Sequence, residues 1–292
     1  MMTLARARRS VLYVPAANER AMTKAESLAC DAIIFDLEDA VAASVKADAR
    51  AALQAHFSAS PTSTKGRIIR VNGAATAWGA EDLAVASVCK PDAVLLPKVE
   101  TAEQVLEVRT ALDRSNAPDT RLWAMIETPL GIVNIREIAA LGAKPSIGLE
   151  CLVAGTNDLA KETGLPLPEG RSTMMLWLAS VIIHARAFGL DVLDGVYNDF
   201  NDADGFTAEC RQGVNMGFGG KTLIHPKQIE PANTAFSPDT ALIEEARAIV
   251  AAFAAPENSQ RGVLSLNGRM VERLHAEMAA RTLAKAGIVF NG

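Results

Sequence analysis

Carboxylates stand at the ends of several apolar segments of this chain. The stretch "AMIETPLGIVNIREIAALG" (124–142) reads as a buried strand followed by a helix, with Glu127 at the join. A carboxylate is rarely buried without a partner, because a bare charge away from water is costly. Either Glu127 starts the following helix, with Pro129 early in that helix, or it holds a ligand at the mouth of a cleft.

Carboxylates without clustered His or Cys suit a hard divalent cation. Mg²⁺ is typically held by one or two carboxylates, and water and substrate oxygens complete its shell. Glu127 and Asp158 follow consecutive apolar segments, so we expect them to share one ion; Asp158 could instead be an N-cap. The other carboxylates at such an end are Asp36, Glu38 and Asp39.

Two cations occupy similar positions. Arg70 lies in "GRIIRVNG" (66–73), and its planar fork of donors suits a substrate carboxylate. It could instead pair with Glu38 or Asp39, which we expect to orient the site through hydrogen bonds. Lys98 is expected to bind substrate; the alternatives are a salt bridge at the rim or a Schiff-base nucleophile.

The elements that must position these residues alternate with a period near 30 residues. The apolar segments are mostly continuous runs, which is typical of parallel strands covered on both faces. Eight strand–helix units predict an α/β fold of the TIM (β/α)8 barrel type, whose functional groups lie at the carboxyl ends of the strands. A doubly wound sheet is the alternative, but no GxGxxG follows the first strand. The predicted strands span 9–15, 31–39, 66–73, 92–100, 121–128, 146–155, 190–197 and 219–224; the clearest helices span 19–29, 44–57 and 101–115.

The pattern changes after about residue 237. We expect a barrel over 1–237 and a small C-terminal segment over 238–292, with helices at 238–255 and 271–287 and a short strand-like "GVLSL" between them. This segment is expected to act as a lid over its own barrel or a neighbour's.

Composition bounds the class of protein. The 292 residues carry a net charge of -5, which disfavours a broad nucleic-acid surface. No apolar run reaches about 18 residues, so no membrane span is predicted. The four cysteines are far apart, without a CxxC pair, and the N-terminal apolar stretch is too short for a signal peptide. We therefore expect reduced thiols, a cytoplasmic protein and a small-molecule partner.

The order and spacing of several motifs resemble a known family. The motifs are "RSVLYVPAANERAMTKAESLACDAIIFDLEDAVAASVKADAR", "IRVNG", "LLPKVET", "MIETPLGIVNIREIA", "GTNDLA" and "GFGGKTLIHPKQI". Together they are similar to the citrate lyase beta subunit-like members of the HpcH/HpaI aldolase superfamily, over nearly the whole chain.

The resemblance implies a Mg²⁺-dependent lyase that cleaves or forms a C–C bond in a carboxylated 3-hydroxyacyl thioester of the citryl-, malyl- or citramalyl-CoA type, carried by CoA or an acyl-carrier protein. It implies Glu127 and Asp158 as metal ligands, Arg70 as the binder of the substrate's carboxylate or keto-acid end, and Glu38 and Asp39 as supporting residues. We add Gly155 and Thr156 of "GTNDLA" as substrate contacts. A homotrimer or hexamer is also implied.

One motif departs from the family. Related lyases often carry an acid/base Asp in a C-terminal "G-x-M-[VI]-D-x-P" stretch, where this chain has "NGRMVERL" and therefore Glu272. The lyase interpretation, in which the C–C bond breaks by a retro-Claisen mechanism, has four alternatives. They are a metal-dependent pyruvate aldolase of 4-hydroxy-2-keto acids, a malyl-CoA thioesterase, a Schiff-base aldolase and a non-catalytic barrel.

Overall fold

The fold is given by a computed structural model, which describes residues 7–165, 171–258, 260–286 and 288. The chain divides into two compact units. One unit runs from Arg8 to Asn233, and the other includes the chain from Thr234 onward. The division falls inside helix α10 (Ile229–Phe236), whereas the sequence placed the boundary at 237/238.

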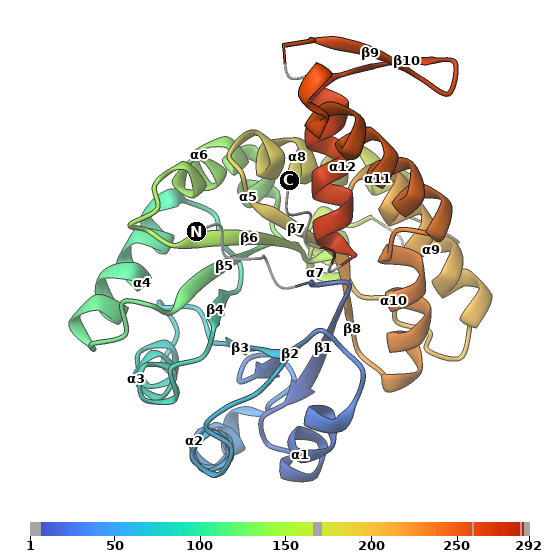
Figure 1. The fold of residues 1–292 in the computed structure, drawn as a ribbon. Helices are drawn as coiled ribbons and strands as arrows, with labels where there is room; N and C mark the ends of the chain where they lie inside the picture. Colours follow the sequence, from blue (N-terminus) through green and yellow to red (C-terminus); the bar gives the residue numbers. More distant parts are fainter. Residues whose placement is uncertain (1–6, 166–170, 259, 287, 289–292) are drawn as a thin grey trace. The chain divides into compact units, whose positions relative to one another are not determined.

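The first unit is a closed barrel of eight parallel strands in chain order, as Figure 1 shows. The barrel closes where Ser10 of β1 pairs with Lys221 of β8. The predicted TIM-barrel fold is confirmed. Its strands are β1 (Ser10–Pro15), β2 (Ala32–Asp36), β3 (Gly66–Arg70), β4 (Ala93–Leu96), β5 (Arg121–Ile126), β6 (Leu149–Ala154), β7 (Asp191–Asp194) and β8 (Gly220–Leu223).

Every strand except β1, which ends at Pro15 as predicted, ends earlier than the sequence predicted. β2 stops at Asp36 rather than at residue 39, because the Asp36 carboxylate accepts the backbone N–H of Glu38 at 2.9 Å and that of Ala40 at 3.1 Å. These bonds turn the chain out of the sheet. The polar residues Glu38, Lys98, Glu127 and Asp158 therefore lie in the loops or helices that follow the strands, and not in the strands themselves.

Alternation along the strands decides which residues face the barrel interior. The interior of the barrel is an apolar cluster that includes Ile34, Ile68, Met125 and Val153. Two residues after each of these four positions, the same face presents Asp36, Arg70, Glu127 and Gly155. A polar layer therefore lies directly on the apolar interior, at the carboxyl ends of the strands.

Helices surround the strands (Figure 1), and the predicted helices at 19–29, 44–57 and 101–115 are present with ends shifted by one or two residues. Their bounds are α1 (Glu19–Ser27), α2 (Lys46–Ala59), α3 (Gly79–Cys89), α4 (Ala102–Arg114), α5 (Pro129–Val133), α6 (Ile135–Ala140), α7 (Thr156–Thr163), α8 (Met175–Ala187) and α9 (Ala203–Met216). α4 begins with a capping box between Thr101 and Gln104, which fixes its first turn.

A buried ion-pair network fastens the outer layer to the barrel. Asp194 ends β7 and accepts Lys221 Nζ at 3.0 Å and a guanidinium N–H of Arg171. Lys221 also contacts Glu209 of α9 at 2.7 Å. Burial acts to raise the pKa of Asp194, but the two cations outweigh it and lower the pKa. Every charge in this network has a partner, which is the condition for burying it.

The second unit has its own apolar core between α11 (Thr240–Ala254), α12 (Arg273–Lys285) and an antiparallel hairpin. The hairpin joins β9 (Val263–Leu266) to β10 (Arg269–Glu272). Asn267 and Gly268 have φ of +50° and +78°, the left-handed pair that an Asn-Gly hairpin turn requires. The predicted helix start at residue 271 was therefore wrong, because Val271 and Glu272 belong to β10.

The four cysteines are free, and all but Cys89 are buried. Among the described residues, no helix is both long and apolar enough to cross a bilayer.

Candidate metal and substrate site

Glu127 directly follows β5 and is 1% exposed. Its Oε1 accepts the backbone N–H of Lys98 at 2.8 Å, while its Oε2 is buried without a hydrogen-bond partner. The helix-start role belongs to the next residue, because Thr128 is the N-cap of α5 and accepts the Gly131 N–H at 3.0 Å. Glu127 therefore does not cap α5, and one of its carboxylate oxygens has no hydrogen-bond partner.

Asp158 lies near this carboxylate. It is the third residue of α7, whose N-cap is Gly155, so Asp158 neither ends β6 nor caps the helix. Burial raises the pKa of Glu127 to about 8, with further contributions from the charges of Glu38 and Asp158. Two carboxylates whose negative charges repel each other, one with an unpaired oxygen, are a donor set that fits a divalent cation.

The described residues contain no group of three or more His, Cys, Asp or Glu that could enclose a metal ion. A closed zinc-type site is therefore a poor fit to them, whereas Mg²⁺ needs only one or two protein carboxylates. The predicted ligand pair, Glu127 and Asp158, remains the best fit to a metal.

Gly155 makes room for the Glu127 side chain. A Cβ at position 155 would lie 2.3 Å from Glu127 Cβ and 2.6 Å from its Oε2, which is closer than real atoms approach. The Gly155 N–H donates to the carbonyl of Ile126 at 3.0 Å, which keeps β5 and β6 in register at this point. Thr156, the first residue of α7, is buried. "GTNDLA" therefore brings a space-making glycine and Asp158 to the same end of the barrel.

Arg70 ends β3 and is held by two acidic residues. Its Nε and Nη2 donate to Asp36 at 2.7 and 2.6 Å, and its Nη1 lies 2.8 Å from Glu38 Oε2. The pairing of Arg70 with Glu38, expected as the alternative to substrate binding, is present. The bidentate partner is Asp36, a carboxylate expected at this strand end to which no role was given. The signal was available, because Asp36 continues the interior alternation of Ile34.

Lys98 contacts Glu38 rather than standing free. Its Nζ lies 2.7 Å from Glu38 Oε1 and 3.8 Å from Asp39, whose side chain is 60% exposed. Burial acts to lower the pKa of Lys98, but the hydrogen bond and charge of Glu38 outweigh it and raise the pKa. A Schiff-base nucleophile needs a neutral amine. The structure therefore disfavours the lysine-aldolase alternative.

The Lys98 backbone is itself in an uncommon conformation. Its φ of +48° lies in the left-handed region, which costs a residue with a Cβ roughly 1–2 kcal/mol. The same residue donates its N–H to Glu127 and its ammonium to Glu38. The strained backbone is consistent with a residue that must hold both carboxylates at once.

Carboxylates outnumber cations in this layer. The acidic residues are Asp36, Glu38, Asp39, Glu127 and Asp158. The basic side chains that contact these carboxylates are Arg70 and Lys98, and Lys46 donates to the backbone carbonyl of Glu38 at 2.9 Å. An anionic substrate would be repelled from such a layer unless a cation accompanied it. A bound divalent cation would therefore reduce the excess charge as well as satisfy Glu127.

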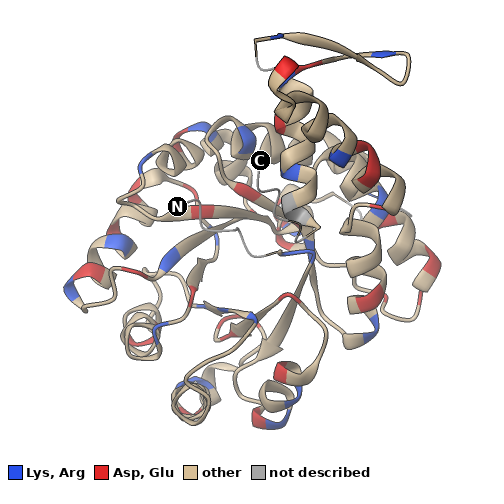
Figure 2. Ribbon diagram, viewed as in Figure 1, with Lys and Arg blue, Asp and Glu red and all other residues tan. Residues whose placement is uncertain are grey.

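The remaining predicted residues lie elsewhere. Glu272 ends β10 in the second unit, where its N–H donates to His275 Nδ1 at 2.9 Å. His225 follows β8 and caps a short 3-10 turn with Gln228. Over the described residues seen in Figure 2, acidic and basic positions are interspersed on the outer helices of the barrel.

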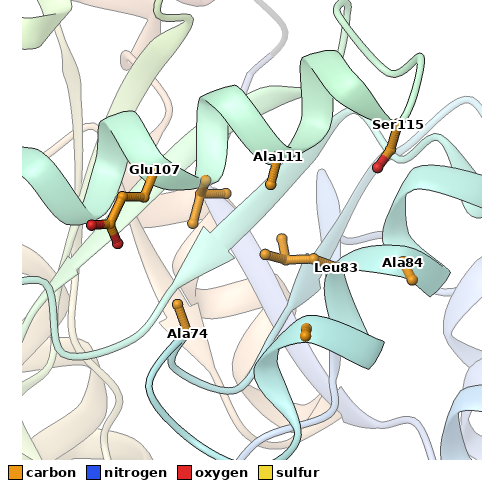
Figure 3. A pocket seen from close by; sticks show the side chains of 8 residues that line it. Ala74, Leu83, Ala84, Glu107, Ala111 and Ser115 are labelled. Carbon is orange, nitrogen blue, oxygen red and sulfur yellow. The ribbon is translucent and has the colours of Figure 1, made fainter.

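One cavity, of about 260 Å³, lies between α3 and α4 (Figure 3). Its lining is mostly small and apolar, with Glu107 and Ser115 as its polar side chains. None of the predicted site residues lines it. The candidate site is therefore identified by its charged groups and their geometry rather than by this cavity.

We predict that Mg²⁺ binding strengthens as pH rises. Glu127 is protonated in the metal-free protein below its pKa of about 8, and a cation must displace that proton. The dissociation constant for Mg²⁺ should fall by roughly tenfold per pH unit from about pH 6 until it levels off near pH 8. Calorimetric titration measures it, and a constant affinity over this range would contradict the assignment. Glu127→Gln should abolish the pH dependence.

We predict that Asp36→Asn destabilises the barrel. The amide cannot neutralise Arg70, so the substitution breaks a buried ion pair and should lower the free energy of unfolding by about 3–5 kcal/mol. Urea denaturation followed by circular dichroism measures this quantity. Asp39→Asn is the matched control: it removes a mostly exposed charge and should cost less than about 1 kcal/mol. Equal losses in the two variants would show that Asp36 is not the anchor of this layer.

Comparison with known proteins gives a consistent result. Residues 9–226 match the family model described as HpcH/HpaI aldolase/citrate lyase. A (3S)-malyl-CoA thioesterase of Cereibacter sphaeroides is 50% identical over 278 residues, which are 95% of this chain and 94% of the relative. The citrate lyase subunit beta of Escherichia coli is 33% identical, over 96% of this chain and 94% of the relative.

A solved structure, the protein CitE of Mycobacterium tuberculosis in complex with magnesium, acetoacetate and coenzyme A, superposes with a TM-score of 0.77. It is 30% identical to this chain, and the match covers 98% of this chain and all of the other. Magnesium in this neighbour agrees with the Mg²⁺ that the carboxylate pair favours. With a barrel of the same fold and a family match over most of its length, this chain belongs to the HpcH/HpaI aldolase/citrate lyase family.

Proposed function

We propose that this protein is a Mg²⁺-dependent enzyme that acts on a carboxylated 3-hydroxyacyl-CoA thioester such as malyl-CoA, and that its net reaction is hydrolysis of the thioester. The observation that carries the proposal is Glu127, whose buried unpaired oxygen lies near Asp158 and a clamped arginine. The choice of hydrolysis rests on the likeness to a malyl-CoA thioesterase at 50% identity, which exceeds the likeness to the citrate lyase subunit.

Glu127 and Asp158 would hold the metal ion. Bound there, Mg²⁺ would polarise the substrate's oxygens and fix their orientation. Gly155 leaves the space that Glu127 occupies, and the N-terminal end of α7 favours the negative charge of Asp158.

Arg70 would bind the carboxylate of the acyl group. A guanidinium has five N–H donors, of which two bond Asp36, while Nη1 forms an ion pair with Glu38 and contacts the Met125 sulfur at 4.0 Å. The few that remain are held rigidly, so Arg70 can orient a carboxylate at little entropic cost. Lys98, through its contact with Glu38, keeps this acidic partner of Arg70 in place.

The two candidate reactions begin from the same bound substrate. In hydrolysis, water adds to the thioester carbonyl, the C–S bond breaks and the leaving thiolate takes a proton, which gives a hydroxy-dicarboxylate and CoA. In the lyase reaction the 3-hydroxyl loses its proton and the adjacent C–C bond breaks. A keto acid leaves, and the thioester enolate takes a proton. C–C cleavage is the second candidate, favoured by the likeness to citrate lyase beta subunits.

Product analysis tests the reaction type. We expect malyl-CoA and Mg²⁺ to give free thiol and malate in equal amounts, with glyoxylate and acetyl-CoA at trace level. A thiol reagent measures the free CoA that hydrolysis releases, and formation of glyoxylate phenylhydrazone measures C–C cleavage. Glyoxylate with acetyl-CoA would establish the lyase instead, and turnover of a free 4-hydroxy-2-keto acid in place of the thioester would establish the aldolase. Glu127→Gln should abolish turnover in a protein that still folds.

The predicted acid/base role of Glu272 stays a prediction, and so do the predicted oligomer and cytoplasmic location. We expect Glu272→Gln to lower kcat by about 100-fold or more, because a positioned acid/base group contributes at least that much. Glu272→Asp should keep most of the activity, since it restores the residue type of the related lyases. Glu277→Gln, an exposed carboxyl of α12, is the control. A Glu272→Gln variant with the full kcat would remove Glu272 from the mechanism.

A further inference from the structure

Tyr13 lies on the interior face of β1 and is only partly buried. Its ring packs against the apolar barrel cluster, among residues such as Ile34 and Met125. Because a tyrosine reaches further than the aliphatic residues beside it, its outer end reaches the polar layer above. Tyr13 therefore lies between the apolar interior of the barrel and the charged residues of the polar layer.

The ring of Tyr13 supports the arginine of the site. The Arg70 Cζ lies 5.0 Å from the centroid of the Tyr13 ring, within the range of a cation–π interaction. Asp36 and Glu38 hold the guanidinium by its edge, and the Tyr13 ring contacts it from its face. Arg70 is thus fixed in two directions by groups that belong to three different strands or loops.

The hydroxyl of Tyr13 has only a weak partner among the described residues, the sulfur of Met125 at 3.9 Å. The same sulfur lies 4.0 Å from Nη1 of Arg70. A thioether sulfur is a poor acceptor, so this O–H keeps most of its capacity to donate. The donor lies beside an arginine that gives two N–H groups to Asp36 and whose Nη1 is paired with Glu38.

We propose that Tyr13 is a substrate-binding residue whose hydroxyl donates to the same carboxylate that Arg70 orients. A carboxylate next to Arg70 needs donors beyond the few that Arg70 retains, and a phenol O–H is a strong one toward an anion. The inference rests on the proposed function for its substrate, a hydroxy-dicarboxylate acyl group.

The test uses (S)-malate as a probe, with saturating Mg²⁺, so that binding is measured apart from turnover. Tyr13→Phe removes only the hydroxyl and keeps the ring under Arg70. We expect it to weaken malate binding roughly tenfold, the usual effect of losing a hydrogen bond to a charged group. Mg²⁺ affinity should be unchanged, and KM for malyl-CoA should rise by a similar factor with a much smaller change in kcat.

Met125→Leu is the matched control, because it removes the sulfur and leaves the hydroxyl. Malate affinity in this variant should stay within about twofold of the unmodified protein, since little is lost with a weak acceptor. The sulfur contacts both the Tyr13 hydroxyl and Nη1 of Arg70, so equal losses in both variants would mean that Tyr13 acts through this shared contact and not through its own bond to the carboxylate, and would overturn the proposal. So would unchanged malate binding in Tyr13→Phe, or no malate binding by the unmodified protein. If malate binds as expected while malyl-CoA is not turned over, the proposed function fails and the role of Tyr13 stands.

Discussion

The bidentate pair between Asp36 and Arg70 is the interaction on which the rest of the site depends. It joins the ends of the neighbouring strands β2 and β3, where Asp36 and Arg70 are register partners, and both side chains are almost fully buried. The same Asp36 carboxylate turns the chain after β2 by accepting two backbone N–H groups. That turn brings Glu38 to Arg70 and Lys98, and the Lys98 N–H in turn holds Glu127. One buried ion pair thus begins a chain of contacts that ends at the candidate metal ligand.

This chain of contacts explains why burial does not make the layer unstable. A buried charge is tolerated when a counter-charge and hydrogen bonds satisfy it. Asp36, Arg70 and Glu38 meet that condition within the protein, and so does the separate network of Asp194 and Lys221. Glu127 meets it only in part, since one oxygen is bonded and the other is not. The layer is therefore complete as a structure except at the one point where a ligand would add to it.

The sequence predicted the barrel and the location of the site because both follow from local pattern. Continuous apolar runs separated by amphipathic helices are enough to identify eight parallel strands, and the carboxyl-end rule then groups Glu127, Arg70 and the "DLED" residues. The alternation that continues from Ile34 points Asp36 to the barrel interior, but its pairing with Arg70 depends on the register of β2 against β3, which the sequence pattern does not give. The pattern also left open whether Asp158 caps the following helix, since a single residue, Gly155, separates β6 from α7 and the cap position cannot be read from the pattern. The Asn267–Gly268 pair is typical of a hairpin turn, but the apolar residues after it suit a helix equally well, so the predicted helix began two residues too early.

The barrel residues described here do not by themselves select between hydrolysis and C–C cleavage. Both reactions need a bound carboxylate, a fixed hydroxyl and an activated oxygen, and Arg70 with the Glu127–Asp158 pair can serve either. The difference must lie in whether water reaches the thioester carbonyl and in where a proton is delivered. The residue that we expect to decide them is Glu272, the acid/base group that the family resemblance predicts. In the segment "NGRMVERL", Glu272 is the last residue of β10. Its side chain is one methylene longer than the aspartate that the family resemblance predicts at this position. A carboxyl that reaches further is better suited to a water molecule than to a fixed carbon centre, where about 1 Å of misplacement is costly. The departure from the family motif therefore argues in the same direction as the likeness to the thioesterase.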